Sequence, residues 1–166
     1  MLDFLAGAKH ALESTTLAMF SREFANFVTG ATDKSEAADR LHSVLEPVSL
    51  DAFKDFIRQS ERSGIRMEML KLTIHAAYLV GAQYDRVPRG PTRNSLGAEV
   101  GGVPVDERLR IQVCFEITEH VNVKLPDDPE PGPVAKQNVA IWQFESLVTS
   151  LDAIEWRIEP LNLVSR

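Results

Sequence analysis

The spacing of hydrophobic residues changes at Gly64, and this change divides the chain into a helical part and a β-rich part. Up to Gly64, apolar side chains recur every three or four residues, which is the period of an amphipathic helix. One such helix is predicted over residues 2–20. Two more helices follow. Residues 33–36 form a capping sequence for the first, which ends at Pro47, and Ser49 caps the second, which ends at Gly64.

A shorter helical stretch lies between the first two of these helices. Ser21 has the side-chain oxygen of a helix cap, and Phe24, Phe27 and Val28 repeat at helical spacing before Gly30. Three N-terminal helices are therefore expected before the first strand, with a helical restart at Ser21.

Beyond Gly64, apolar and polar residues alternate, which is the period of a β-strand. Strands are predicted over residues 65–87, with an irregularity near Gly81, and over residues 108–118. The second of these strands has an apolar face made of Leu109, Ile111, Val113, Phe115 and Ile117. Two further strands, at residues 139–147 and 154–163, are joined by a short connection and should form an antiparallel hairpin.

Prolines and glycines mark two loops between the strands, at about residues 88–106 and 125–137. Helices followed by antiparallel strands predict an α+β fold, in which three helices pack on one face of a curved, mainly antiparallel four-stranded sheet. We expect residues 1–166 to form a single domain, with helices over about residues 2–63 and strands over about residues 65–164.

Charge and composition narrow the range of functions. The chain has a net charge of -6 and a pI of about 5.2, whereas proteins that bind nucleic acid or anionic membranes usually carry a basic excess. The one cysteine, Cys114, excludes an intrachain disulfide and a multi-cysteine zinc site. No apolar run reaches the roughly 20 residues that span a bilayer, and residues 1–20 lack the arginines of a transit peptide.

Two parts of the chain resemble a known family. Residues 4–12 read FLAGAKHAL and residues 17–24 read LAMFSREF, which is similar to the first helix of the m-AAA protease-interacting protein family. Near the other end, residues 142–145 read WQFE and residues 155–158 read EWRI. The same aromatic hairpin is found in the related inner-membrane import-motor anchoring subunit and in the mitoribosomal large-subunit membrane-anchoring protein.

The resemblance implies a cone-shaped fold similar to that of nuclear transport factor two. It also implies a location in the mitochondrial matrix, peripheral to the inner membrane, with any presequence lying outside the sequence shown. The family members act as adaptors or accessory subunits, so the resemblance implies protein subunits of a larger complex as partners, with peripheral contact to the inner membrane as an option.

A cone of this kind can also hold an enzyme, because a curved sheet and its helices can enclose a pocket that shifts the pKa of a buried side chain. His75, Tyr78 and Glu116 are the strand residues that could act there. If the helices cover the face that carries Val113 and Phe115, however, His75 and Glu116 point outward, and solvated strand residues are the better interpretation. We therefore expect no catalytic residues.

Metal and cofactor sites find little support in the sequence. The four histidines, which lack the i, i+4 spacing that places two imidazoles on one helical face, are His10, His42, His75 and His120. Glu119 beside His120 could join a site formed by the fold, but exposed residues at the end of a strand explain this pair better. The glycines at residues 97–102 lack the lysine and hydroxyl of a phosphate loop. Neither a metal nor a cofactor is expected.

Basic residues form the most distinctive polar pattern. Lys54, Arg58 and Arg62 lie on one stripe of a predicted helix, with Arg66 just beyond it. Arg86, Arg89 and Arg93 cluster in or near the first loop. Together these residues form a candidate partner-binding surface, although charges neutralised by neighbouring Asp and Glu explain the pattern equally well.

Three functions follow, in order of preference. The first is a non-catalytic adaptor or accessory subunit of an assembly at the mitochondrial inner membrane, such as a protease, a translocase, a respiratory or ATP synthase complex, or a ribosome. The second is a small cone-fold lyase, isomerase or hydrolase. The third is a module that faces mitoribosomal RNA through its arginines. DNA is not expected as a partner, and RNA only in the third case.

Overall fold

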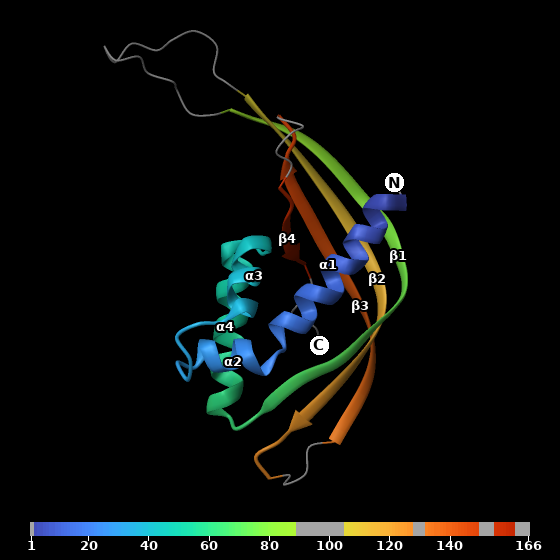
Figure 1. Ribbon diagram of the computed structural model, residues 1–166. Coiled ribbons are helices and arrows are strands. Elements are labelled where there is room, and N and C mark those ends of the chain that lie inside the picture. The colour runs from blue at the N-terminus through green and yellow to red at the C-terminus, as the bar shows by residue number, and fades with distance from the viewer. Residues whose placement is uncertain (1, 89–104, 128–131, 150–154, 162–166) are drawn as a thin grey trace, which may run out of the picture.

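Four helices are followed by four strands in the computed structural model, which describes residues 2–88, 105–127, 132–149 and 155–161 (Figure 1). The helices are α1 (Leu2–Met19), α2 (Arg22–Val28), α3 (Glu36–Val44) and α4 (Pro47–Arg62). The strands are β1 (Arg66–Pro88), β2 (Val105–Lys124), β3 (Gly132–Leu147) and β4 (Arg157–Pro160). This order confirms the α+β class.

The number of helices corrects the expectation of three, because Ser21 begins a helix of its own. Its Oγ accepts a hydrogen bond of 3.1 Å from the backbone N–H of Phe24, which caps α2. Ser35 caps α3 in the same way. Its hydroxyl also donates to Glu23 at 2.8 Å, so the two short helices are tied together, and this hydrogen bond lowers the pKa of Glu23.

The ends of the helices follow the predicted chemistry with one exception. Gly30 and Gly64 adopt positive φ angles of 79° and 71°, which few other residues tolerate. The exception is α4, for which Ser49 is the wrong cap. This helix begins at Pro47, since a proline has no N–H to lose in the first turn and its fixed φ already suits a helix.

The four strands lie in sequence order, each antiparallel to its neighbours, in a curved sheet that does not close. The pairing of β1 with β2 shifts register at three places, and one of them confirms the irregularity predicted near Gly81. The antiparallel pairing predicted for the last two strands is also confirmed, although within the described residues β4 covers only Arg157–Pro160 of the predicted residues 154–163. The second loop is shorter than expected, because residues 132–137 belong to β3 and pair with β2. This part of β3 has no described strand on its other side, and such an edge tolerates Pro133.

The hydrophobic core lies between the helices and the concave side of the sheet (Figure 1). Val113, Phe115 and Ile117 alternate along β2 and are all buried, as the sequence predicts. Trp142 of β3 meets Phe115 edge to face, with ring centroids 6.5 Å apart. Leu12 and Met19 of α1, each 1% exposed, belong to the same cluster. Within the described residues, no helix is long and apolar enough to cross a membrane.

Replacing Phe115 by alanine should lower the free energy of unfolding by about 3–5 kcal/mol, since the side chain is fully buried and the surrounding residues can only partly fill the cavity. Urea denaturation measures the loss. The control is Val48→Ala on α4, where the side chain is 83% exposed and the change should stay within about 0.5 kcal/mol. A loss below about 1 kcal/mol for Phe115→Ala would contradict this core.

Candidate functional site

The concave side of the sheet is where a cone-fold enzyme would hold its substrate, and here it is largely filled by side chains. Phe115, Trp142 and Phe144 project from the strands, and Leu12 and Met19 meet them from α1. Phe4 adds a ring whose centroid lies 5.6 Å from that of Phe144. Among the residues that the structure describes, a small opening remains beside Glu119, near the C-terminal end of α1.

The opposite face of the sheet has no described helix on it. The register places Tyr78, Cys114 and Ile141 in one row across three strands, and Ala76, Glu116 and Val139 in the next. Because Cys114 lies between the buried Val113 and Phe115, both rows point away from the core. We call these six residues the open-face band. Tyr78 and Val139 are about half exposed, at 49% and 48%.

The three strand residues considered for catalysis all lie on this face. The expectation that His75 and Glu116 point outward is confirmed, because the side chains of both residues are exposed to solvent. His75 Nε2 is hydrogen-bonded to Thr118 Oγ1 at 2.7 Å. The negative charge of Glu116, followed by partial burial and the hydrogen bond between the two side chains, raises the pKa of Tyr78. The shift strengthens the preference of this tyrosine for its neutral form.

A ladder of polar side chains borders one side of the open-face band. Gln112 donates to Gln143 at 3.2 Å, and Gln143 donates to Glu159 at 2.9 Å, which links three strands. One row further, Arg110 donates to Glu145 at 2.7 Å and to Asp85 at 3.0 Å. Each side chain is thus held by a neighbour on the next strand, so this border is both polar and well ordered.

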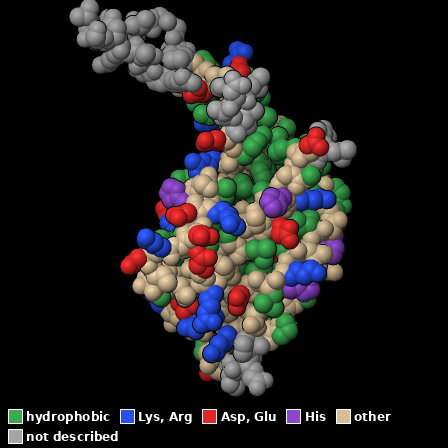
Figure 2. Space-filling model, in the orientation of Figure 1, with side chains coloured by type: hydrophobic (Ala, Val, Ile, Leu, Met, Phe, Trp, Pro, Cys, Tyr) green, Lys and Arg blue, Asp and Glu red, His purple; other side chains and the backbone are tan. Residues whose placement is uncertain are grey.

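The structure does not gather the predicted basic residues into one surface. Lys54 is paired with Asp51 at 3.3 Å, and Arg58 with Asp55 at 2.8 Å, each within one turn of α4. Arg62 is exposed near the end of that helix. Cationic and anionic side chains are correspondingly interspersed over the helical side of the molecule (Figure 2).

The remaining basic residues are divided between the two ends of β1. Arg66 begins the strand and Arg86 lies near its other end, roughly 60 Å away along the strand at about 3.3 Å per residue. Arg86 is 3.8 Å from Glu107, and a hydrogen bond with Tyr84 raises its pKa. Arg89 and Arg93 lie outside the described residues.

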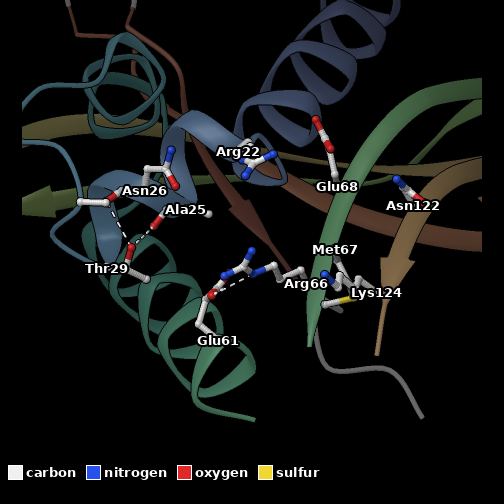
Figure 3. A pocket seen from close by; sticks show the side chains of 11 residues that line it. Arg22, Ala25, Asn26, Thr29, Glu61, Arg66, Met67, Glu68, Asn122 and Lys124 are labelled. Atoms are coloured by element: carbon white, nitrogen blue, oxygen red, sulfur yellow. Dashed lines mark hydrogen bonds and ion pairs between the residues drawn. The ribbon is translucent and has the colours of Figure 1, made fainter. Parts of the chain in front are cut away.

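Arg66 instead lines a groove that the sequence did not reveal (Figure 3). The groove has a volume of about 460 Å³ and lies between α2, the end of α4, the start of β1 and the end of β2. We call it the α2–β1 groove. Its polar lining residues are Arg22, Asn26, Thr29, Glu61, Arg66, Glu68, Asn122 and Lys124.

The charges of the α2–β1 groove are not balanced. Arg66 Nε lies 3.3 Å from Glu61 Oε2, so this cation has a partner. Arg22 and Lys124 have no carboxylate within ion-pair distance among the residues that the structure describes. Lys124 is directly opposite Arg66 in the sheet, and like charges in that position destabilise a sheet.

Sequence reasoning missed Arg22 and Lys124 because they come together only through the register. Arg22 begins α2, and Lys124 ends the strand that returns to pair with β1 after a long connection. Arg22 directly follows the predicted cap Ser21, whereas Lys124 lies six residues beyond the strand predicted over residues 108–118. The sequence positions of Arg22 and Lys124 do not indicate that their two elements meet in the fold.

Glu119 lines a separate cavity of about 160 Å³ between α1 and the sheet, with Thr16, Lys136 and Trp142 among the residues around it. Burial raises the pKa of this carboxyl group, and the charge of Lys136 and a hydrogen bond with Asn138 offset only part of the effect. His120 lies on the opposite face of β2, so the two residues do not form a pair. Over the described ranges, no group of three or more His, Cys, Asp or Glu side chains is placed to hold a metal ion.

Glu119→Gln should stabilise the protein at neutral pH. A raised pKa means that folding favours the protonated carboxyl, so the contribution of Glu119 is complete below its unfolded pKa of about 4.3 and is lost as the pH rises through the folded value. Urea midpoints of the variant should exceed those of the wild type at pH 7, and the difference should vanish near pH 4. Glu13→Gln, on the exposed side of α1, is the control for removing one negative charge. If Glu119→Gln raised the urea midpoint equally at pH 7 and pH 4, the raised pKa of Glu119 would be contradicted.

No family model matches the chain, and no curated protein matches its sequence. Among solved structures, the chain is similar to the intermembrane space region of the chloroplast protein ARC6, with 13% identity over 75% of this chain and 77% of that chain. The TM-score is 0.38, and a likeness of this degree carries no conclusion about function.

Proposed function

We propose that this chain is a non-catalytic protein-binding module, an adaptor or accessory subunit that docks through its open-face band onto a larger assembly at the matrix side of the mitochondrial inner membrane. The mitochondrial setting rests on the resemblance of residues 4–12 and of the aromatic hairpin to the m-AAA protease-interacting protein family. The docking surface rests on the geometry of the sheet.

The observation that carries the proposal is the composition of the open face. One row of the band, formed by Tyr78, Cys114 and Ile141, is apolar, and the ladder that includes Gln112 and Arg110 gives this row a polar border. An apolar centre with a polar rim is the usual anatomy of a protein interface. Tyrosine is also among the residues that most often dominate binding energy.

Electrostatics favour a protein over a lipid surface as the occupant of this face. The chain has a net charge of -6, and Glu116 lies in the middle of the band. An anionic membrane would repel both, whereas a protein can supply a hydrogen-bond donor to the carboxylate. The same charge opposes RNA, the third of the functions considered.

One observation favours the second candidate, a small cone-fold enzyme. Glu119, with its raised pKa, would then be the acid–base group in place of His75, Tyr78 or Glu116. Its cavity of about 160 Å³ is smaller than the roughly 300–1,000 Å³ of typical small-molecule sites. We therefore rank docking first.

Tyr78→Ala should reduce the amount of partner that co-purifies with the tagged protein from detergent-solubilised mitochondria by about tenfold or more, as truncation of a central tyrosine typically does. The readout is quantitative mass spectrometry of the retained subunits. Chemical denaturation of the isolated variant shows whether it is folded. A second variant, Glu116→Gln, keeps the shape of the side chain and should also reduce the amount of co-purified partner if the band is the interface.

The chain offers a matched control in Tyr84→Ala. Tyr84 lies on the same strand and is 51% exposed, but the register pairs it with Leu109, so it points to the opposite side of the sheet. This variant should retain its partners. If Tyr78→Ala and Tyr84→Ala retain equal amounts of partner, the open face is not the docking surface. If the wild-type protein is recovered only as a free monomer, the adaptor function itself is contradicted.

A further inference from the structure

We propose that the α2–β1 groove is a second binding site, separate from the open-face band, and that it takes an extended acidic segment of a protein. Arg22 and Lys124 hold carboxylates of that segment, and Asn26 and Asn122 bind its main chain. Figure 3 shows these four side chains around one opening, contributed by α2 and by the end of β2.

The charges of the groove are arranged at an energetic cost. Arg66 and Lys124 lie opposite each other on neighbouring strands, where two like charges are unfavourable and an opposite pair would be favourable. Glu61 neutralises Arg66 but is not within ion-pair distance of Lys124. An anion bound between these cations would remove the repulsion, so the site is arranged for a ligand that supplies negative charge.

Several cations elsewhere in the chain have carboxylate partners. On α4, Lys54 and Arg58 each have a carboxylate one turn away, and on the sheet Arg110 has two. Within the described ranges, Arg22 and Lys124 lack such partners although the protein has more acidic than basic residues. Other described cations, such as Lys9, Lys71 and Arg62, also lack ion pairs, but Arg22 and Lys124 are two such cations that line the same groove.

The charges and amides of the groove indicate which class of anion it can hold. Two carboxylates, Glu61 and Glu68, line the groove beside the three cations and leave an excess of one positive charge. A carboxylate, with one negative charge, is accommodated more easily there than a phosphate, which carries close to two. Asn26 and Asn122 each offer a donor and an acceptor, the pair of groups that a peptide unit needs.

The size of the groove agrees with a short stretch of chain. Its volume of about 460 Å³ falls within the range of pockets that enclose several residues' worth of atoms. Met67 and Ala25 add apolar contacts beside the polar groups, which suits a segment with aliphatic residues between its acidic ones. A segment with acidic residues separated by small or aliphatic ones therefore matches the unpaired cations, the two asparagines and the apolar side chains of the groove, while Glu61 remains paired with Arg66.

The test uses a fluorescein-labelled, end-blocked peptide of eight residues in which glutamate and alanine alternate, titrated with the full-length protein by fluorescence anisotropy. Binding should weaken as salt is raised, because the contacts are largely ionic. A peptide with glutamine in place of glutamate should bind at least tenfold more weakly. Vesicles that contain phosphatidylserine, and inorganic phosphate added as a competitor, should bind less well than the glutamate peptide.

The decisive variant is Arg22→Glu with Lys124→Glu, which should weaken peptide binding by at least tenfold. The control makes the same change in charge at Arg58→Glu with Arg62→Glu, two exposed residues of α4 that do not line the groove, and should change binding less than threefold. Failure of the glutamate peptide to bind at low salt would overturn the proposal, as would equal losses in both double variants or tighter binding to the vesicles.

Lys124→Glu alone separates binding from folding. It replaces a like-charge pair opposite Arg66 with an opposite-charge pair, so the urea midpoint should rise while peptide binding falls. A variant that is more stable and binds less cannot be explained by misfolding. If its midpoint falls, or if it binds the peptide as well as the wild type, the assignment of Lys124 to the site is wrong. Partners that co-purify through the open-face band are unaffected by either result, which keeps the two proposals distinguishable.

Discussion

The packing of α1 across the concave side of the sheet is the contact on which the other features depend. Leu12 and Met19 cover Phe115 and Trp142, and this burial supplies much of the apolar area that the core removes from water. It fixes which face of every strand points inward. Because the strand period is two, the outward face is fixed at the same time, so Tyr78 and Glu116 are exposed as a direct consequence of where Phe115 is buried.

The same constraint explains why the molecule presents two different kinds of candidate binding surface. The helices lie on one side of the sheet only, so its other side can present a broad band formed by three strands. The groove arises where the helical layer ends, because α2 and the end of α4 lie beside β1 there without covering it. A broad face suits a folded partner, and a narrow polar groove suits a single segment of chain.

The sequence predicted those features that depend on local period and on single residues. The alternation from Leu109 to Ile117 identified the buried face of β2, and the glycines at positions 30 and 64 identified two helix ends. Three helices were expected instead of four because the short stretch after Ser21, which forms the seven-residue α2, was interpreted as a restart and not counted as a separate helix. Residues 132–137 were taken for a loop because Pro133 disfavours strands, yet an edge position permits it.

The candidate sites were harder to predict, because they depend on which elements meet. Lys54, Arg58 and Arg62 follow one another at helical spacing and were easy to find, but two of them are paired with carboxylates of the same helix. The groove depends on the register that sets Arg66 against Lys124 across a long connection, which no local pattern encodes.

Site-specific photo-crosslinking in intact mitochondria tests the central claim, that the uncovered face of the sheet is a protein interface. A crosslinker at Ala76 on that face should capture a defined subunit, and one at Val48 on α4 should not. Capture from α4 alone, or from neither position, would contradict the account.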